Sequence, residues 1–162
     1  LRIFVQQKNG TYLPRVLRAA PGATRVCVRD LNADGLPDLM ALFAQGDEGI
    51  YRYINLGGGS FREEPVLRFP PCWGSSSFRL YDVDGDSRED IVHTCGDNAD
   101  YAPTPKPYHG VRIFLQKAGN EYFLETFLPL NGAYDAIPAD FDNDGDVDLA
   151  TVAFFPDWDR EP

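Results

Sequence analysis

Histidine, methionine and cysteine are scarce in this chain of 162 residues, which has two, one and three of them respectively. The cysteines and histidines show no C-x-x-C or mixed cluster of the kind that binds zinc or haem. No run of about 18 apolar residues occurs, so the sequence predicts no membrane-spanning helix. Basic residues are also in the minority, with 15 Lys and Arg against 25 Asp and Glu. The net charge of −10 argues against nucleic acid or an anionic membrane surface as a partner.

Helix signals are missing as well. No segment shows a sustained apolar period of 3.6 residues with capping residues at its ends, so we expect almost no helix. Glycine and proline are instead abundant, with 15 and 13 copies, and they separate short apolar runs. Such punctuation is typical of an all-β protein. Hydrophobic residues make up 43% of the chain, which is enough to build a core and argues against disorder.

Three acidic segments align without gaps. They begin at Asp30, Asp82 and Asp140, and their starts are 52 and 58 residues apart. Each has Asp at position 1, Asp or Asn at 3, Asp at 5, Gly or Ser at 6 and Asp at 9, followed by an aliphatic residue. Apolar runs of strand length flank them. These predicted strands are residues 26–29 and 39–43, 78–81 and 91–94, and 136–139 and 149–155.

A second motif alternates with the acidic one, at residues 3–12, 52–61 and 113–122. Each copy is a β-rich run, a turn rich in Gly or Asn, and an aromatic residue that opens the next run, which predicts a β-hairpin. One acidic motif and one hairpin together give four antiparallel strands in about 50 residues, which is the size of a propeller blade. The sequence therefore predicts an all-β fold made of such blades.

The acidic motifs predict calcium sites, because closely spaced carboxylates need a countercharge and a flexible set of oxygen ligands selects Ca²⁺. The predicted side-chain ligands are Asp30, Asn32, Asp34 and Asp38 in the first loop, Asp82, Asp84, Asp86 and Asp90 in the second, and Asp140, Asp142, Asp144 and Asp148 in the third. The backbone carbonyls of Leu36, Arg88 and Asp146 complete the predicted shells. About three structural ions would lower the formal charge from −10 to −4, so we expect the fold to depend on calcium.

These loops have two alternative interpretations. An EF-hand needs a bidentate Glu at position 12 and flanking helices, whereas position 12 here is Ala41, His93 or Thr151 and the flanks are β-rich. The other alternative is that the loops are solvated acidic turns, since Asp and Gly are common in turns. Three copies in register, each between predicted strands, favour the metal-binding interpretation.

The acidic loops and the aromatic-rich hairpins that follow them resemble FG-GAP/VCBS repeats, and the resemblance extends over nearly the whole chain. It implies the calcium-binding blades of an integrin-like β-propeller, most similar to the secreted bacterial VCBS-repeat type. Ser87 departs from the pattern, because it stands where the loops of the family usually have Gly.

The repeats divide the chain into a half blade (residues 1–18), two blades (24–68 and 76–129) and a second half blade (134–162). Three blade equivalents are fewer than the four that propellers usually need to close. We therefore expect exposed blade faces, and either a longer propeller or completion of the ring by partner chains, a second copy among them.

The sequence also bears on disulfide formation and on the cellular location of the protein. A hairpin brings Cys72 and Cys95 near enough for a disulfide, although the residues favour neither the bonded nor the free state, and Cys27 is expected to be a buried thiol. Millimolar calcium is found outside the cytoplasm, so we expect an extracytoplasmic protein, whether secreted, periplasmic or at the cell surface.

A catalytic site is not evident in the sequence. His93 lies in a predicted strand and is interpreted as a packed residue. The segment 96–110 is the most function-like feature, because it is long, carries Tyr101 and Tyr108, and replaces a much shorter connection in the preceding blade. A blade connector is the other interpretation of it, and Trp73 and Trp158 are assigned to the blade core.

We expect a non-catalytic module that binds protein or glycan through its loops, or takes part in assembly. The alternative is the propeller portion of a carbohydrate-active enzyme such as a polysaccharide lyase. The approach of Arg25, Arg29 and Arg79 to the propeller channel would favour that alternative.

Overall fold

The computed structural model describes residues 1–97 and 106–155, and it contains twelve strands and no helix over these ranges. The prediction of an all-β chain is therefore confirmed. No helix in the described part of the chain is long and apolar enough to cross a membrane. The strands are β1 (Arg2–Gln6), β2 (Tyr12–Val16), β3 (Ala23–Arg29), β4 (Asp38–Phe43), β5 (Gly49–Asn55), β6 (Phe61–Arg68), β7 (Ser75–Tyr81), β8 (Asp90–Cys95), β9 (Gly110–Lys117), β10 (Glu121–Pro129), β11 (Ala133–Ala139) and β12 (Asp148–Ala153).

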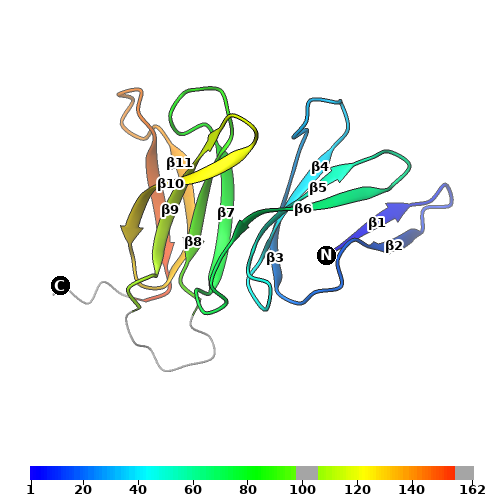
Figure 1. Ribbon diagram of the computed structural model, residues 1–162, viewed down its shortest axis with the longest axis horizontal. Coiled ribbons are helices and arrows are strands. Elements are labelled where there is room, and N and C mark those ends of the chain that lie inside the picture. The colour runs from blue at the N-terminus through cyan, green and yellow to red at the C-terminus, as the bar shows by residue number, and fades with distance from the viewer. Residues whose placement is uncertain (98–105, 156–162) are drawn as a thin grey trace.

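The strands form four antiparallel sheets that follow one another in chain order (Figure 1). The two central sheets have four strands each, β3-β4-β5-β6 and β7-β8-β9-β10, and every strand pairs with its neighbour in sequence. Over the described ranges, the first and last sheets have two strands each, β1-β2 and β11-β12. Up-and-down sheets of this kind, packed in series, are consistent with the blades of a β-propeller.

The core lies between consecutive sheets. Successive side chains of a strand point to opposite faces, and β4 shows this alternation clearly. Met40 and Leu42 pack toward the β7–β10 sheet with Phe78 and Ile91, whereas Ala41 and Phe43 belong to a second cluster toward the β1–β2 hairpin. A third, smaller cluster joins the β7–β10 sheet to β11 and consists of Val92, Val111 and Ala136. Each sheet is therefore held mainly by apolar contacts with its neighbours.

The same β-bulge occurs near the start of the first strand in three sheets. The register shifts lie between Ala23 and Arg25 in β3, between Ser75 and Ser77 in β7, and between Ala133 and Asp135 in β11. A bulge bends its strand and increases the local twist, so these three strands begin with the same distortion. The repeat seen in the sequence is thus also a repeat of backbone geometry.

Candidate metal centres in the acidic loops

The three acidic segments are the loops between the first and second strands of their sheets. They connect β3 to β4, β7 to β8 and β11 to β12, and all three lie at the same end of the sheets, which is the upper end in Figure 1. Because the sheets pack in series, the loops form a row along one end of the molecule. Each ligand set predicted from the sequence is thus held between two paired strands.

The three loops share one pattern of hydrogen bonds. The carboxylate at position 1 accepts a hydrogen bond from the backbone N–H at position 6, and the carboxylate at position 5 accepts one from the N–H at position 7. The first set of distances is 2.9 Å for Asp30–Gly35, 2.8 Å for Asp82–Ser87 and 3.1 Å for Asp140–Gly145. The second is 2.8 Å for Asp34–Leu36, 2.9 Å for Asp86–Arg88 and 2.9 Å for Asp144–Asp146. These bonds fold each loop back on itself and gather its oxygens.

The turn at position 6 uses the left-handed backbone region in every loop. The φ angles are 85° for Gly35, 68° for Ser87 and 95° for Gly145. Left-handed backbone costs an L-residue with a Cβ about 1–2 kcal/mol, and Ser87 carries that strain. The departure from glycine noted in the sequence therefore leaves the turn conformation unchanged.

The aspartate at position 9 connects its loop to the rest of the sheet. Asp38 is fully buried; its Oδ2 accepts the N–H of Leu31 in the loop at 2.9 Å, and its Oδ1 accepts the N–H of Asn55 at the end of β5 at 2.7 Å. Asp90 repeats this with Val83 at 2.9 Å and Gln116 at 2.8 Å. Each carboxylate oxygen has two lone pairs, so these bonds leave acceptor capacity for an ion.

Two of the loops bring three carboxylates together. Asp82, Asp84 and Asp86 each place an oxygen within 4.8 Å of the others, and Asp140, Asp142 and Asp148 do the same. Asp90 and Asp144 lie outside these groups. The first loop has Asn32 in place of one carboxylate and forms no such group, although the Asn32 side chain contacts Asp34 at 2.8 Å. That the carbonyls of Leu36, Arg88 and Asp146 act as ligands stays a prediction.

One buried atom indicates that a cation fits the second loop. Asp82 Oδ1 is buried and has no hydrogen-bond partner among the described residues, whereas its Oδ2 accepts the N–H of Ser87. An unpaired buried carboxylate oxygen is unfavourable unless a countercharge meets it. A calcium ion held by Asp82, Asp84 and Asp86 would supply that countercharge.

Two basic side chains that were not predicted to act here lie close to the second loop. The Arg88 guanidinium forms an ion pair with Asp86 and donates to the Gln116 carbonyl at 3.0 Å. Lys117 Nζ lies 4.0 Å from Asp84. The loop pattern predicts only the carbonyl of Arg88 as part of the site. Its side chain instead opposes the approach of a cation.

Replacing Arg88 with glutamine is expected to raise the calcium affinity of the second loop by up to about fivefold. The change removes a positive charge that pairs with Asp86, and an exposed pair of this kind is worth up to about 1 kcal/mol. Calcium titration of the variant by calorimetry measures the effect. Arg62→Gln is the matched control, because Arg62 pairs with Glu64 of its own strand β6 in another sheet and should leave the affinity of the second loop unchanged. Equal affinities in the two variants would contradict the prediction.

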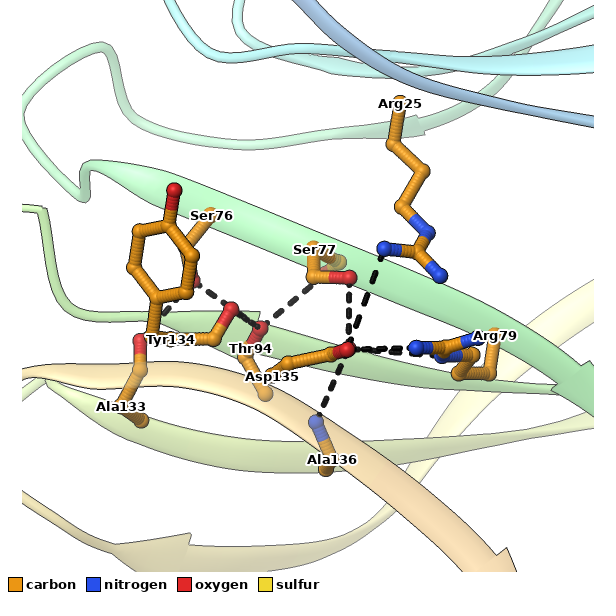
Figure 2. Close-up of polar contacts among 9 residues, drawn as sticks. All are labelled: Arg25, Ser76, Ser77, Arg79, Thr94, Ala133, Tyr134, Asp135 and Ala136. Atoms are coloured by element: carbon orange, nitrogen blue, oxygen red, sulfur yellow. Dashed lines mark hydrogen bonds and ion pairs between the residues drawn. The ribbon is translucent and has the colours of Figure 1, made fainter. Parts of the chain in front are cut away.

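A second polar cluster joins the first strands of three sheets, as Figure 2 shows. Asp135 of β11 accepts hydrogen bonds from Arg79 at 2.5 Å and from Ser77 at 2.8 Å, both on β7, and Arg25 of β3 lies 3.8 Å away. Partial burial on its own would raise the pKa of Asp135, but the hydrogen bonds and the charges of both arginines outweigh it and hold that pKa below its usual value. Arg25 and Asp135 also line a cavity of about 320 Å³.

The three arginines considered for the channel thus do not act together. Arg25 and Arg79 converge on Asp135, whereas Arg29 forms an ion pair with Glu89 at 2.7 Å. The positive charges of Arg25 and Arg79 are compensated by a carboxylate. This arrangement gives the enzyme interpretation no support and favours a structural role between sheets.

A buried array of Glu48, Ser75 and His93 resembles hydrolytic machinery in composition only. Ser75 donates from its Oγ and its backbone N to Glu48 Oε1, at 2.5 and 2.8 Å, and His93 Nε2 lies 2.8 Å from the same Oγ. All three residues are buried, so no substrate reaches the hydroxyl. Burial lowers the pKa of His93 to about 3, and His93 stacks on Phe69 with 4.4 Å between ring centroids. The interpretation of His93 as a packed residue is confirmed.

The other candidate residues that the structure describes contact neighbouring residues of the fold. Trp73 stacks on Phe69 and lies under the guanidinium of Arg112, 3.9 Å from its ring, as expected for a core residue. The Tyr108 carbonyl accepts a hydrogen bond from Arg112 at 2.7 Å. Tyr101 and Trp158 lie outside the described residues. Cys27, Cys72 and Cys95 are all free thiols, so Cys72 and Cys95 are not joined; the Cys95 thiol donates to the Trp73 carbonyl at 2.6 Å.

Comparison with known families identifies the repeat. The family model described as FG-GAP-like repeat matches residues 30–93, from the first acidic loop to the strand that follows the second. This segment is similar to an FG-GAP-like repeat. The matched range therefore contains one acidic loop with its following hairpin, then β7, the second acidic loop and most of β8. The assignment to the bacterial secreted type stays a prediction.

A curated protein is similar to a larger part of the chain. It is the T-cell immunomodulatory protein homolog of Plasmodium falciparum (isolate 3D7), which is 28% identical over 135 residues. The match covers 74% of this chain but only 18% of the relative, so the chain spans about a fifth of that protein's length. No solved structure matches the chain.

Proposed function

We propose that this chain is a calcium-stabilised FG-GAP module that binds a protein or glycan and acts outside the cytoplasm without catalysing a reaction. The observation that carries the calcium part is the recurrence of one loop geometry three times, with a buried, unpaired carboxylate oxygen at Asp82. The residues that would hold the ions are the carboxylates of the three loops, with Asn32 in the first. The ions would supply countercharge and cross-link each loop.

The binding role draws on the family match and on the absence of a reactive constellation among the described residues. The Ser75–His93 pair is buried, and the arginines near Asp135 are already paired. FG-GAP repeats generally take part in protein interactions, and rigid sheets that present loops at their ends suit such a role. The millimolar calcium outside the cytoplasm is the condition in which modest loop sites would be filled.

Calcium titration by calorimetry tests the metal assignment. We expect about three bound ions in the full chain and one fewer in Asp82→Asn, because the variant loses the carboxylate whose oxygen is unpaired. Glu121→Gln is the matched control, since it removes one negative charge from a strand outside the loops and should keep all the ions. If the full chain binds no calcium, the loops are solvated acidic turns and the metal assignment is wrong.

Screening of the calcium-loaded chain tests the ligand class. A glycan array and affinity capture with defined candidate proteins should show saturable binding that EGTA abolishes. A polysaccharide lyase assay, which detects the unsaturated product by absorbance, should show no activity. Lyase activity above that of a heat-denatured sample would overturn the non-catalytic assignment and favour the carbohydrate-active alternative.

A further inference from the structure

The three bulges at the starts of β3, β7 and β11 surround one cavity. The extra residue of each bulge, which pairs with no residue of the neighbouring strand, is Thr24, Ser76 and Tyr134 respectively. All three carry a hydroxyl group, and all three line the cavity of about 320 Å³. The residues that follow them in the chain line it as well, namely Arg25, Ser77 and Asp135. A bulge re-aims the side chain of its extra residue, so one distortion repeated three times directs three hydroxyl residues to the same place.

This cavity lies at the end of the sheets opposite the acidic loops. The bulges occur at the starts of the three strands, whereas the acidic loops follow the ends of the same strands. A strand of seven residues separates the two places by about 20 Å. The cavity walls come from three sheets that pack in series, so they do not depend on any sheet outside the described residues.

Hydrogen bonds between the bulges hold the cavity walls in place, as Figure 2 shows. Ser76 Oγ lies 2.8 Å from the Ala133 carbonyl oxygen and 2.9 Å from Thr94 Oγ1, which joins the bulges of β7 and β11. Ser77 Oγ donates to Asp135 at 2.8 Å and adds a second link between these strands. Polar groups fixed in this way reduce the cost of binding, because a ligand does not have to order them.

Four side chains at the cavity keep hydrogen-bonding groups that the protein does not use. Arg25 forms only the 3.8 Å ion pair with Asp135, and its guanidinium makes no hydrogen bond with the described residues. The hydroxyl groups of Thr24 and Tyr134 make none with them either. Asp135 Oδ2 accepts one hydrogen bond, from Arg79, which leaves its second lone pair unused.

These unused groups match the chemistry of a neutral sugar. The Arg25 guanidinium donates and Asp135 Oδ2 accepts, and neighbouring hydroxyl groups of a sugar ring do both. The ring of Tyr134 offers an apolar face to the C–H side of a sugar. The charges of Arg25 and Arg79 oppose that of Asp135, and Asp97 also lines the cavity, so neither an anion nor a cation is favoured. A volume of about 320 Å³ is at the lower end for small-molecule sites and indicates one sugar unit.

We propose that the cavity between the bulges of β3, β7 and β11 binds one neutral sugar unit of a glycan, whose hydroxyl groups bond to Arg25 and Asp135. The inference rests on the proposed binding role and commits that role to a glycan and to one place in the fold. It separates the two ends of the sheets by task. Ions in the acidic loops would stabilise the sheets, and the sugar would bind at the other end without contacting them.

Chemical-shift mapping with free sugars tests the site. The probes are glucose, galactose, mannose, fucose and N-acetylglucosamine, with galacturonate as the charged comparison, each added at millimolar concentration to the isotopically labelled, calcium-loaded chain. At least one neutral sugar should shift the backbone amides of Thr24, Ser76 and Tyr134 together and in a saturable manner. Stronger binding of galacturonate would overturn the assignment of a neutral ligand, and shifts confined to other residues would overturn the site.

Arg25→Ala is expected to weaken the binding of that sugar about tenfold or more, because the variant loses charge-assisted hydrogen bonds. Arg29→Ala is the matched control, since Arg29 lies on the same strand, pairs with Glu89 and does not line the cavity. It should bind the sugar as the parent chain does. Thr24→Val keeps the size of the side chain, removes only its hydroxyl and should also weaken binding, so the test does not depend on the folding of the Arg25 variant. Unchanged affinity in both cavity variants would contradict the proposal.

Two other outcomes separate the failure of this inference from the failure of the proposed function. If none of the sugars binds but the calcium-loaded chain binds a defined protein saturably, the sugar site is wrong and the binding role stands. If the chain binds no sugar, no glycan of an array and no candidate protein, the binding role itself is wrong.

Discussion

Removal of calcium with EGTA is expected to lower the melting temperature of this chain by about 15 °C or more. The predicted ligand set contains eleven carboxylates and one amide, and without ions these carboxylates repel one another. A site held at a hundred times its dissociation constant contributes about 2.7 kcal/mol, so three sites contribute roughly 8 kcal/mol. For a chain of this length each kcal/mol shifts the melting temperature by about 2–4 °C.

Differential scanning calorimetry measures this shift. Excess calcium should restore the original transition, whereas magnesium should not, because Mg²⁺ requires a smaller octahedral shell and retains its waters. Asp140→Asn should lose part of the calcium-dependent shift, and Glu121→Gln should keep all of it. Identical melting curves in calcium and EGTA would show that the loops need no ion.

Acid is expected to destabilise this chain by about 2–3 kcal/mol between pH 6.5 and pH 4.5 through His93 alone. Burial lowers the pKa of His93 to about 3, whereas an unfolded histidine titrates near 6.5. The unfolded state therefore binds the proton first as the pH falls. The His93 contribution to stability is full above pH 6.5 and is lost progressively toward pH 3, at about 1.36 kcal/mol per unit.

The hydrogen bonds explain why the folded state resists this proton. The Ser75 hydroxyl donates to Glu48, so its oxygen accepts from His93 Nε2, which must carry the hydrogen. The remaining nitrogen, Nδ1, is buried and has no described partner, and the nearby charge of Arg112 also lowers the pKa of His93. A second proton there would be a buried charge without an acceptor.

Urea unfolding at a series of pH values, with EGTA present throughout, isolates the contribution of His93. His93→Gln keeps a donor toward Ser75 but does not titrate, so its stability should fall less steeply than that of the parent chain over this range. The variant is expected to be less stable at pH 7.5, because it loses the contact of the imidazole with Phe69. Parallel pH profiles for the two proteins would contradict the assignment.

Local patterns in the sequence predicted much of this fold because they encode contacts between residues close in the chain. The hairpins at 3–12, 52–61 and 113–122 appear as β1–β2, β5–β6 and β9–β10, since a Gly or Asn turn fixes both strands. The run 149–155 was predicted too long. β12 ends at Ala153, and Phe154 donates its N–H to the Gly132 carbonyl instead of continuing the strand.

Contacts between distant residues could not be predicted in this way. Asp135 meets Arg79 across 56 residues, and Glu48 meets Ser75 across 27, because the sheets pack in series. No spacing rule in the sequence relates these positions. The side chain of Arg88 was missed for a different reason: the loop pattern assigns only its carbonyl, whereas its guanidinium turns back toward Asp86.

The paired hydrogen bonds of the position-nine aspartates make each complete sheet respond as a cooperative unit. Asp38 bonds the amide of a loop residue with one oxygen and the amide of Asn55, at the end of the third strand, with the other. A change in the loop that moves the Asp38 carboxylate therefore also disturbs an amide across the sheet, and Asp90 provides the same link through Gln116. A substitution that displaces this carboxylate is therefore felt at the end of the third strand, by residues that never touch the altered loop.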